Sequence, residues 1–241
     1  MPIRFSAFGR SFAPSWPMTL LTLALLALFT SLGNWQWHRG VAKQATWEQF
    51  ERAPAAGGVR HNVDGATRFE YVRLEGRYEP GRQFLLDNRS HAGRPGYEVL
   101  TPFALADGRR LLVNRGWIPF AGYRDQLPDV AFAADSTTQI AGRLDDLPTA
   151  GLASGRAPPA AAAPWPKLTS FPTRAELEAV LGQSIADKIL LLDPQMPAGY
   201  LREWSPPGLA PDRHYSYAIQ WWGFAVVLLV LYFGLNFRKV S

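Results

Sequence analysis

The chain has 241 residues and no cysteine, which excludes disulfide bonds, iron–sulfur clusters and cysteine-based copper sites. Its net charge of +5 depends on four basic residues close to the chain ends, namely Arg4, Arg10, Arg238 and Lys239. The other 21 of the 25 Lys and Arg face 20 Asp and Glu, so the charge is no sign of nucleic-acid binding.

The first predicted element is an apolar helix near the N-terminus. No Lys, Arg, Asp or Glu lies between Ser11 and His38, and a helix of ~20 apolar residues crosses a hydrocarbon core of ~30 Å. We therefore expect a tail of residues 1–14 and a transmembrane helix over residues 15–37. A cleaved signal peptide is the alternative, but no small-residue cleavage site follows the apolar run.

The region between residues 38 and 213 is predicted to form one mainly antiparallel β domain with short helices. Residues 39–52 have a helical composition and should continue the first helix outward as a polar segment. Runs with period-two or β-rich character then alternate with turn residues, at positions 69–78, 83–89, 96–105, 109–119, 137–147 and 188–194.

Local signals mark the connections within this domain. Residues 106–108 (Ala-Asp-Gly) predict a hairpin turn between two strands. Thr173 followed by Glu176 is a capping box and predicts a short helix that ends at Gly182. The Pro/Ala-rich stretch from 152 to 170 is predicted to be an irregular surface excursion.

A second apolar segment lies near the C-terminus. No charged residue lies between Tyr215 and Phe237, so we expect a second transmembrane helix over residues 214–237 and a tail of residues 238–241. Both tails are basic and contain no acidic residue, and positive charge stays on the cytoplasmic side of membranes. The fold class is thus a membrane protein of α+β type, with both termini cytoplasmic and the middle domain outside.

A search for catalytic motifs favours a protein that is not an enzyme. The sequence contains no serine-hydrolase elbow, P-loop, dinucleotide-binding glycine motif or zinc-protease motif. The acidic pair Asp145–Asp146 has a turn-like context that is typical of solvated loops, and His61 and His91 lie in polar loops or turns.

His214 differs, because it lies at the start of the second apolar helix. Helical spacing places His214, Tyr217, Ala218, Trp221 and Ala225 on one face. An imidazole, two aromatic rings and two small residues suit a flat apolar cofactor, and imidazole is the common axial ligand of haem iron. The alternative is that His214 caps the helix in the headgroup zone and that the aromatic rings form an interfacial belt.

Two further features leave alternatives open. His38 could face His214 from the first helix, or it could be a wetted interface residue next to Arg39. The pairs Asn88–Arg89 and Asn114–Arg115 end two strands, and their guanidinium groups could hold a carboxylate such as a haem propionate. The same arginines could instead tie the turns to carbonyl or acidic groups of the domain itself.

LGNWQWHRGVAK at 32–43 follows the first apolar segment. The stretch 85–119 contains Val113-Asn114-Arg115-Gly116-Trp117, and HYSYAIQWWGFA at 214–225 begins the second apolar segment. In the same order, these three blocks resemble the signature after the first helix, the central block and the start of the second helix in the surfeit-locus-1 family of cytochrome c oxidase assembly proteins. His38 is not part of that signature.

The resemblance implies a protein of the bacterial inner membrane, with its domain in the periplasm, that helps to mature the core subunit of haem–copper oxidase. It implies transient binding of haem a, with His214 as axial ligand of the iron; by the helical spacing above, Tyr217 and Trp221 would stack beside it. The oxidase core subunit, haem a synthase and membrane lipid are the implied partners, and nucleic acid is not. Two alternatives stay open: a scaffold that stabilises an immature oxidase subunit without binding haem, and an exported membrane-tethered enzyme such as a hydrolase.

Overall fold

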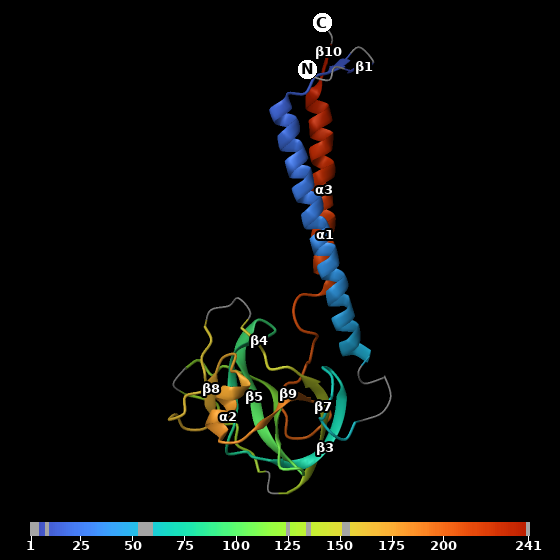
Figure 1. The fold of residues 1–241 in the computed structure, drawn as a ribbon. Helices are drawn as coiled ribbons and strands as arrows, with labels where there is room; N and C mark the ends of the chain where they lie inside the picture. The colour runs from blue at the N-terminus through green and yellow to red at the C-terminus, as the bar shows by residue number, and fades with distance from the viewer. Residues whose placement is uncertain are drawn as a thin grey trace. The chain divides into compact units, whose positions relative to one another are not determined.

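The computed structural model describes residues 5–7, 10–52, 60–123, 126–133, 136–150 and 155–239. The chain divides into two compact units, one formed by Met1–Gln49 with Pro206–Ser241 and the other by Phe50–Ser205. The first unit is built on two long helices and the second on a β-sheet (Figure 1).

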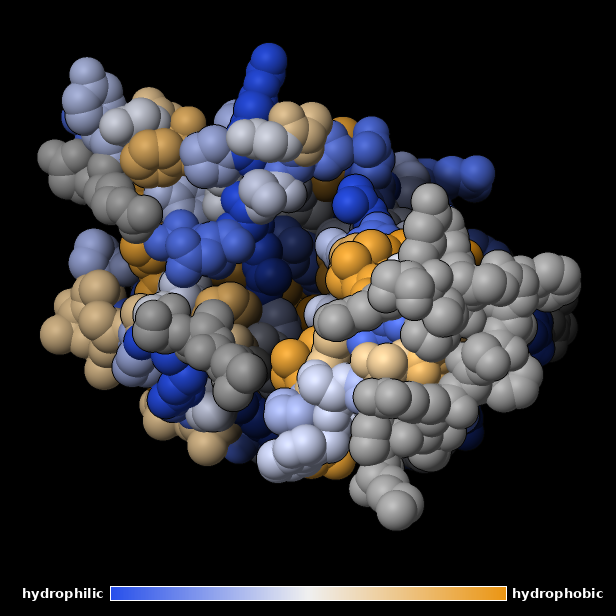
Figure 2. Space-filling view, turned by 90° about the horizontal axis from the view of Figure 1, so that it is seen from above, coloured by the Kyte–Doolittle hydropathy of each residue, from blue (hydrophilic) through white to orange (hydrophobic). Residues whose placement is uncertain are grey.

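The first unit contains helix α1, Trp16–Arg52, as far as Gln49, and helix α3, Pro211–Asn236, side by side and in opposite directions (Figure 1). Both are long and apolar enough to cross a membrane. Helix α1 runs on to Arg52, which confirms the predicted polar extension over residues 39–52. Most of the exposed large apolar side chains belong to these helices, such as Val230 and Leu235 at 65% exposure each. In the space-filling view of Figure 2, hydrophilic and hydrophobic residues lie interspersed over the visible face.

Close packing of α1 against α3 depends on small residues at heptad spacing. Gly33 and Gly40 of α1 are buried, and so are Ala218 and Ala225 of α3. A Cβ on Gly40 would lie 2.6 Å from the ring of Tyr215, so only glycine admits that ring. The spacing of seven on both helices is that of a coiled-coil seam, and small residues let helices approach closely in membranes.

A small antiparallel sheet, which was not predicted from the sequence, joins the two ends of this unit. Its strands are β1, Phe5–Ala7; β2, Arg10–Phe12; and β10, Phe237–Lys239. Strand β2 lies in the middle, between β1 and β10.

The second unit is a seven-stranded sheet in the order β3-β7-β9-β6-β5-β4-β8. An additional pairing of β3 with β5 closes five of these strands into a ring. Most pairs are antiparallel, whereas β6–β9 and β4–β8 are parallel. The bounds are β3, Tyr71–Tyr78; β4, Phe84–His91; β5, Arg94–Leu105; β6, Arg110–Pro119; β7, Thr138–Asp145; β8, Lys167–Thr169; α2, Arg174–Leu181; and β9, Ile185–Leu192.

Successive side chains in the middle of β6 belong to different buried clusters. Leu111 and Val113 belong to one buried cluster, while Leu112 belongs to the other, which also includes Leu177 of α2. Successive side chains of a strand point to opposite faces, so a strand that is covered on both faces carries an unbroken apolar run. This explains the sequence LLV in β6.

The local signals of the sequence are confirmed with one exception. Helix α2 begins with the predicted capping box of Thr173 and Glu176 and ends at Gly182. Gly116 has φ +111, and a Cβ there would lie 2.5 Å from the carbonyl oxygen of Leu201. The prediction of irregular structure over 152–170 is wrong at its end, because β8 pairs there with β4; residues 151–154 lie outside the described residues. The fold class is confirmed: two long apolar terminal helices flank one mainly antiparallel β domain.

Candidate functional site

The side chain of His214 lies against helix α1. It stands in the first turn of α3 and is half-buried, and its Nδ1 lies 2.9 Å from Oε1 of Gln36. The second ring nitrogen, Nε2, has no partner among the described residues. The sequence did not single out Gln36, although it lies seven residues after Phe29 and therefore shares the heptad face of α1.

On the same side of the helix pair as His214, a row of aromatic rings extends away from it along the helices. Phe29 of α1 contacts Trp221 and Phe224 of α3, with ring centroids 5.8 and 6.0 Å apart. Trp221 and Phe224 also meet edge to face at 5.8 Å. Tyr217, between His214 and Trp221 in helical spacing, is 43% exposed. His214, Gln36, Tyr217, Trp221, Phe224 and Phe29 thus form one surface, which we call the histidine flank.

Ala218 and Ala225, the two small residues of the predicted face, pack between the helices and do not belong to the histidine flank. Ala218 and Ala225 are 0% and 5% exposed, and they lie in the seam between the helices. The opposite flank is filled by Trp37, whose ring lies 4.9 Å from Tyr215 and 5.8 Å from Trp222. Of the five residues predicted to share a face, only His214, Tyr217 and Trp221 therefore remain on the histidine flank.

His38 is exposed and does not meet His214. It stands two residues after Gln36, and that step turns the helix by about 200°. The packing of α1 therefore brings Gln36 to His214 and directs His38 away from α3. The alternative in which His38 faces His214 is therefore not the arrangement in the structure.

The arginine of the second Asn-Arg pair is bound within the domain. Arg115 is 3% exposed. It donates to the carbonyl oxygen of Ala198 at 2.5 Å and to Oε1 of Gln83 at 3.0 Å, and its guanidinium lies 3.8 Å from the ring centroid of Phe132. Burial lowers the pKa of this guanidinium. Of the two alternatives for Arg115, the structure has the internal one.

The first Asn-Arg pair meets the second at a shared carboxylate. Asn114 donates to Oε2 of Glu98 at 2.7 Å, and Nε of Arg89 lies 3.8 Å from Oε1 of the same residue. Asn88 has φ +59, at an irregularity in the pairing of β4 with β5. Arg115 is thus engaged inside the domain, whereas Nε of Arg89 is buried and has no hydrogen-bond partner among the described residues, so the structure decides between the two alternatives for Arg115 only.

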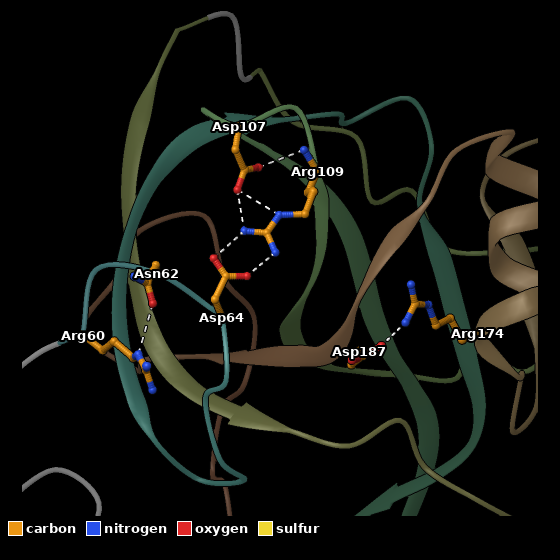
Figure 3. A network of polar contacts seen from close by, with 7 residues as sticks. All are labelled: Arg60, Asn62, Asp64, Asp107, Arg109, Arg174 and Asp187. Atoms are coloured by element: carbon orange, nitrogen blue, oxygen red, sulfur yellow. Dashed lines mark hydrogen bonds and ion pairs between the residues drawn. The ribbon is translucent and has the colours of Figure 1, made fainter.

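Charged side chains elsewhere in the second unit also pair with one another (Figure 3). Arg109 binds Asp64 at 2.5 Å and Asp107 at 2.5 Å, and the guanidinium lowers the pKa of both carboxyls. Arg174 and Asp187 form a further pair. The open cavity of about 460 Å³ beside this network is lined by residues that include His61, Arg73 and Glu75.

The remaining polar candidates pair with neighbouring side chains, and Nε2 of His91 lies 3.6 Å from Oε2 of Glu203. Asp145 binds Arg68 and Asp146 binds Lys188, each at 2.6 Å. His91 packs beside the ring of Trp117 at 5.4 Å. No group of three or more His, Asp or Glu side chains that could hold a metal occurs among the described residues.

Two kinds of comparison with known proteins, a family model and individual relatives, point to the same family. The model of the SURF1 family matches residues 23–226. An uncharacterized SURF1-like protein of Mycobacterium tuberculosis is 30% identical over 225 residues, which are 89% of this chain and 80% of that relative. A SURF1-like protein of Dictyostelium discoideum is 32% identical over 100 residues, and the match covers 36% of this chain and 37% of that protein. The family match includes Gln36 and the whole histidine flank, and the chain therefore belongs to the SURF1 family.

Proposed function

We propose that this protein is an assembly factor of haem–copper cytochrome c oxidase that carries haem a on the histidine flank. Membership of the SURF1 family implies a role in oxidase assembly. The observation that carries the haem proposal is the position of His214. Its half-buried imidazole lies on the same flank of two apolar helices as a row of aromatic rings.

The residues of the histidine flank fit a haem. A haem needs a nitrogen ligand for its iron and apolar or aromatic surface for its ring, and the flank provides both. His214 would supply the ligand through Nε2, because Nδ1 faces Gln36. Tyr217, Trp221 and Phe224 would contact the ring, and Tyr217 is exposed enough to do so without rearrangement of the helix pair.

A carrier must also release its cargo, and the flank is suited to release. The chain has four histidines, of which His61 and His91 belong to the second unit, and His38 is directed away from α3. A single imidazole ligand on an open flank would hold haem a less firmly than two ligands in a closed pocket. We infer a transient complex, in which haem a synthase supplies the haem and the oxidase core subunit receives it.

The same proposal includes location and the absence of catalysis. We place the protein in the bacterial inner membrane, with both termini in the cytoplasm, the second unit in the periplasm and lipid around α1 and α3. The apolar exposed faces of these helices support the membrane anchor. We propose a carrier and not an enzyme; in support, acidic side chains of the second unit such as Asp64 and Asp146 are paired with basic ones.

One observation favours a second candidate, a scaffold that stabilises an immature oxidase subunit without touching haem. Arg115, which could have bound a haem propionate, is buried and donates to groups of the domain itself. In this alternative the histidine flank would contact protein or lipid only.

A spectroscopic comparison tests the carrier against the scaffold. The full chain, purified from cells that make haem a, is expected to show a Soret band that His214→Ala removes or strongly weakens. His61→Ala is the matched control, since His61 is an exposed residue of the second unit, and it should keep the band. Full haem occupancy in folded His214→Ala would end the carrier proposal in favour of the scaffold.

A further inference from the structure

The contact between Gln36 and His214 is held in place by the packing on either side of it. Gln36 lies between Gly33 and Gly40 at the three- and four-residue spacing of the seam. A Cβ on Gly33 would lie 2.3 Å from Nε1 of Trp222, and one on Gly40 would lie 2.6 Å from the ring of Tyr215. These two ring contacts fix the register of α1 against α3, because a shift by one turn would move the helix by about 5.4 Å.

The atoms that meet across this contact decide which ring nitrogen of His214 carries the proton. The amide oxygen of Gln36 faces Nδ1 at 2.9 Å. An oxygen can only accept, so the hydrogen bond requires Nδ1–H as donor. A neutral imidazole with a proton on Nδ1 has its lone pair on Nε2. That nitrogen is the one without a partner among the described residues.

We propose that Gln36 is a positioning residue, which holds His214 in the Nδ1–H tautomer and directs Nε2 outward as the iron ligand. The inference rests on the carrier function proposed above. Metal-binding histidines generally donate their other N–H to an oxygen that fixes the tautomer and the ring orientation. Gln36 supplies that oxygen from the neighbouring helix, so the ligand is prepared before haem arrives.

The position of the pair in an apolar helix unit strengthens this argument. A polar group without a partner is costly in an apolar environment. Nδ1–H therefore gains more from Gln36 here than it would in water. With the amide oxygen of Gln36 turned toward the ring, as in the structure, the alternative tautomer would place Nδ1 and that oxygen as two facing acceptors. Gln36 acts through His214.

The first test observes the tautomer without haem. The full chain is labelled with ¹⁵N-histidine, purified haem-free in detergent, and compared with His214→Gln to identify the His214 signals. Wild type is expected to carry its proton on Nδ1, and Gln36→Leu is expected to move His214 toward the other tautomer. A wild-type His214 with its proton on Nε2 would overturn the inference, even where haem binding through His214 stands.

The second test measures haem affinity by titration with haem a. Gln36→Leu should weaken binding about 10- to 100-fold, as is usual for loss of a residue that orients a metal ligand. Gln36→Glu keeps an acceptor oxygen and should restore both the tautomer and most of the affinity. Asn34→Leu is the matched control, because it removes an exposed amide two residues away on the same helix and should change neither.

These outcomes separate the two proposals. If His214→Ala keeps full haem occupancy, the carrier function fails, whereas the tautomer measurement still reports on Gln36. If His214→Ala loses haem but Gln36→Leu binds it as wild type does, the carrier function stands and the positioning role of Gln36 is refuted. Equal losses in Gln36→Leu and Asn34→Leu would also refute it, because the effect would then not depend on the contact with His214.

Discussion

Gly33 of α1 and Trp222 of α3 are packed so closely that a Cβ on Gly33 would lie 2.3 Å from the indole nitrogen. The indole ring therefore occupies the space that any other side chain at position 33 would need. Because Gln36 follows three residues later on the same face, this contact also determines which residue of α1 meets His214.

Gly33→Ala should destabilise the helix pair by about 1–3 kcal/mol, the usual cost of overpacking a tight contact. Gly223→Ala is the control, because a Cβ at Gly223 meets nothing within 4 Å. Each substitution of glycine by alanine raises helix propensity by about 1 kcal/mol. The difference between the free energies of unfolding of the two variants therefore reports the contact with Trp222. Unfolding in detergent, followed by tryptophan fluorescence, measures the free energy of each variant. Equal stabilities would contradict the packing described here.

His38→Ala should leave the Soret spectrum of the haem-loaded protein unchanged. His38 is exposed and is turned away from α3, while Gln36 faces His214. The measurement is the position and intensity of the Soret band in His38→Ala and in His214→Ala, side by side. A change in His38→Ala as large as that in His214→Ala would mean that both helices ligate the iron.

Arg115→Ala should destabilise the second unit strongly. The change removes the donor to the carbonyl oxygen of Ala198, and a buried acceptor left without a partner costs about 1–3 kcal/mol. It also removes one of the two donors to Oε1 of Gln83, which keeps its hydrogen bond from Thr101. Arg73→Ala, which removes an exposed arginine of β3, should have little effect. Urea unfolding of the full chain gives the free energy of both variants. If Arg115→Ala folds as stably as Arg73→Ala, Arg115 has no structural role and its assignment to the domain interior is wrong.

Acid should weaken the second unit partly through Glu176. Hydrogen bonds from Arg156 and from the backbone and side chain of Thr173 lower the pKa of Glu176 from 4.5 to about 2. Since the folded state holds the carboxylate in its charged form, its contribution is complete above about pH 4.5 and is lost as the pH falls toward 2. Glu176→Gln should therefore lose less stability than wild type between these pH values. The check is thermal unfolding of both proteins across this range, and parallel curves would contradict the prediction.

Both chain ends should lie in the cytoplasm. The basic residues of the two tails, with no acidic residue beside them, favour this orientation. Alkaline phosphatase fused after Ser241 should be inactive, and the same enzyme inserted at Gly155, in the second unit, should be active in the periplasm. An active phosphatase after Ser241 would reverse the proposed topology.

Features that depend on near neighbours in the chain could be predicted from the sequence. The two apolar helices follow from uninterrupted apolar composition, because the length of a membrane-crossing helix is set by the thickness of the bilayer. The capping box of Thr173 and Glu176 was predictable because both partners lie within one helical turn. The strands were predictable from their alternation, and the sequence blocks around His214 indicated the family.

Features that join distant residues were decided by the tertiary structure. The ring closed by β3 and β5 depends on strand curvature and register, which no local pattern specifies. Arg115 could bind a ligand or the domain itself, and only the position of the loop at Ala198 decided for the domain. His38 and Gln36 are two residues apart, and from the sequence alone only His38 was considered as the residue of α1 that faces His214. The close fit of Gly33 to Trp222 and of Gly40 to Tyr215 rotates α1 so that Gln36 meets His214, because two helices pack in the register that their tightest contacts allow.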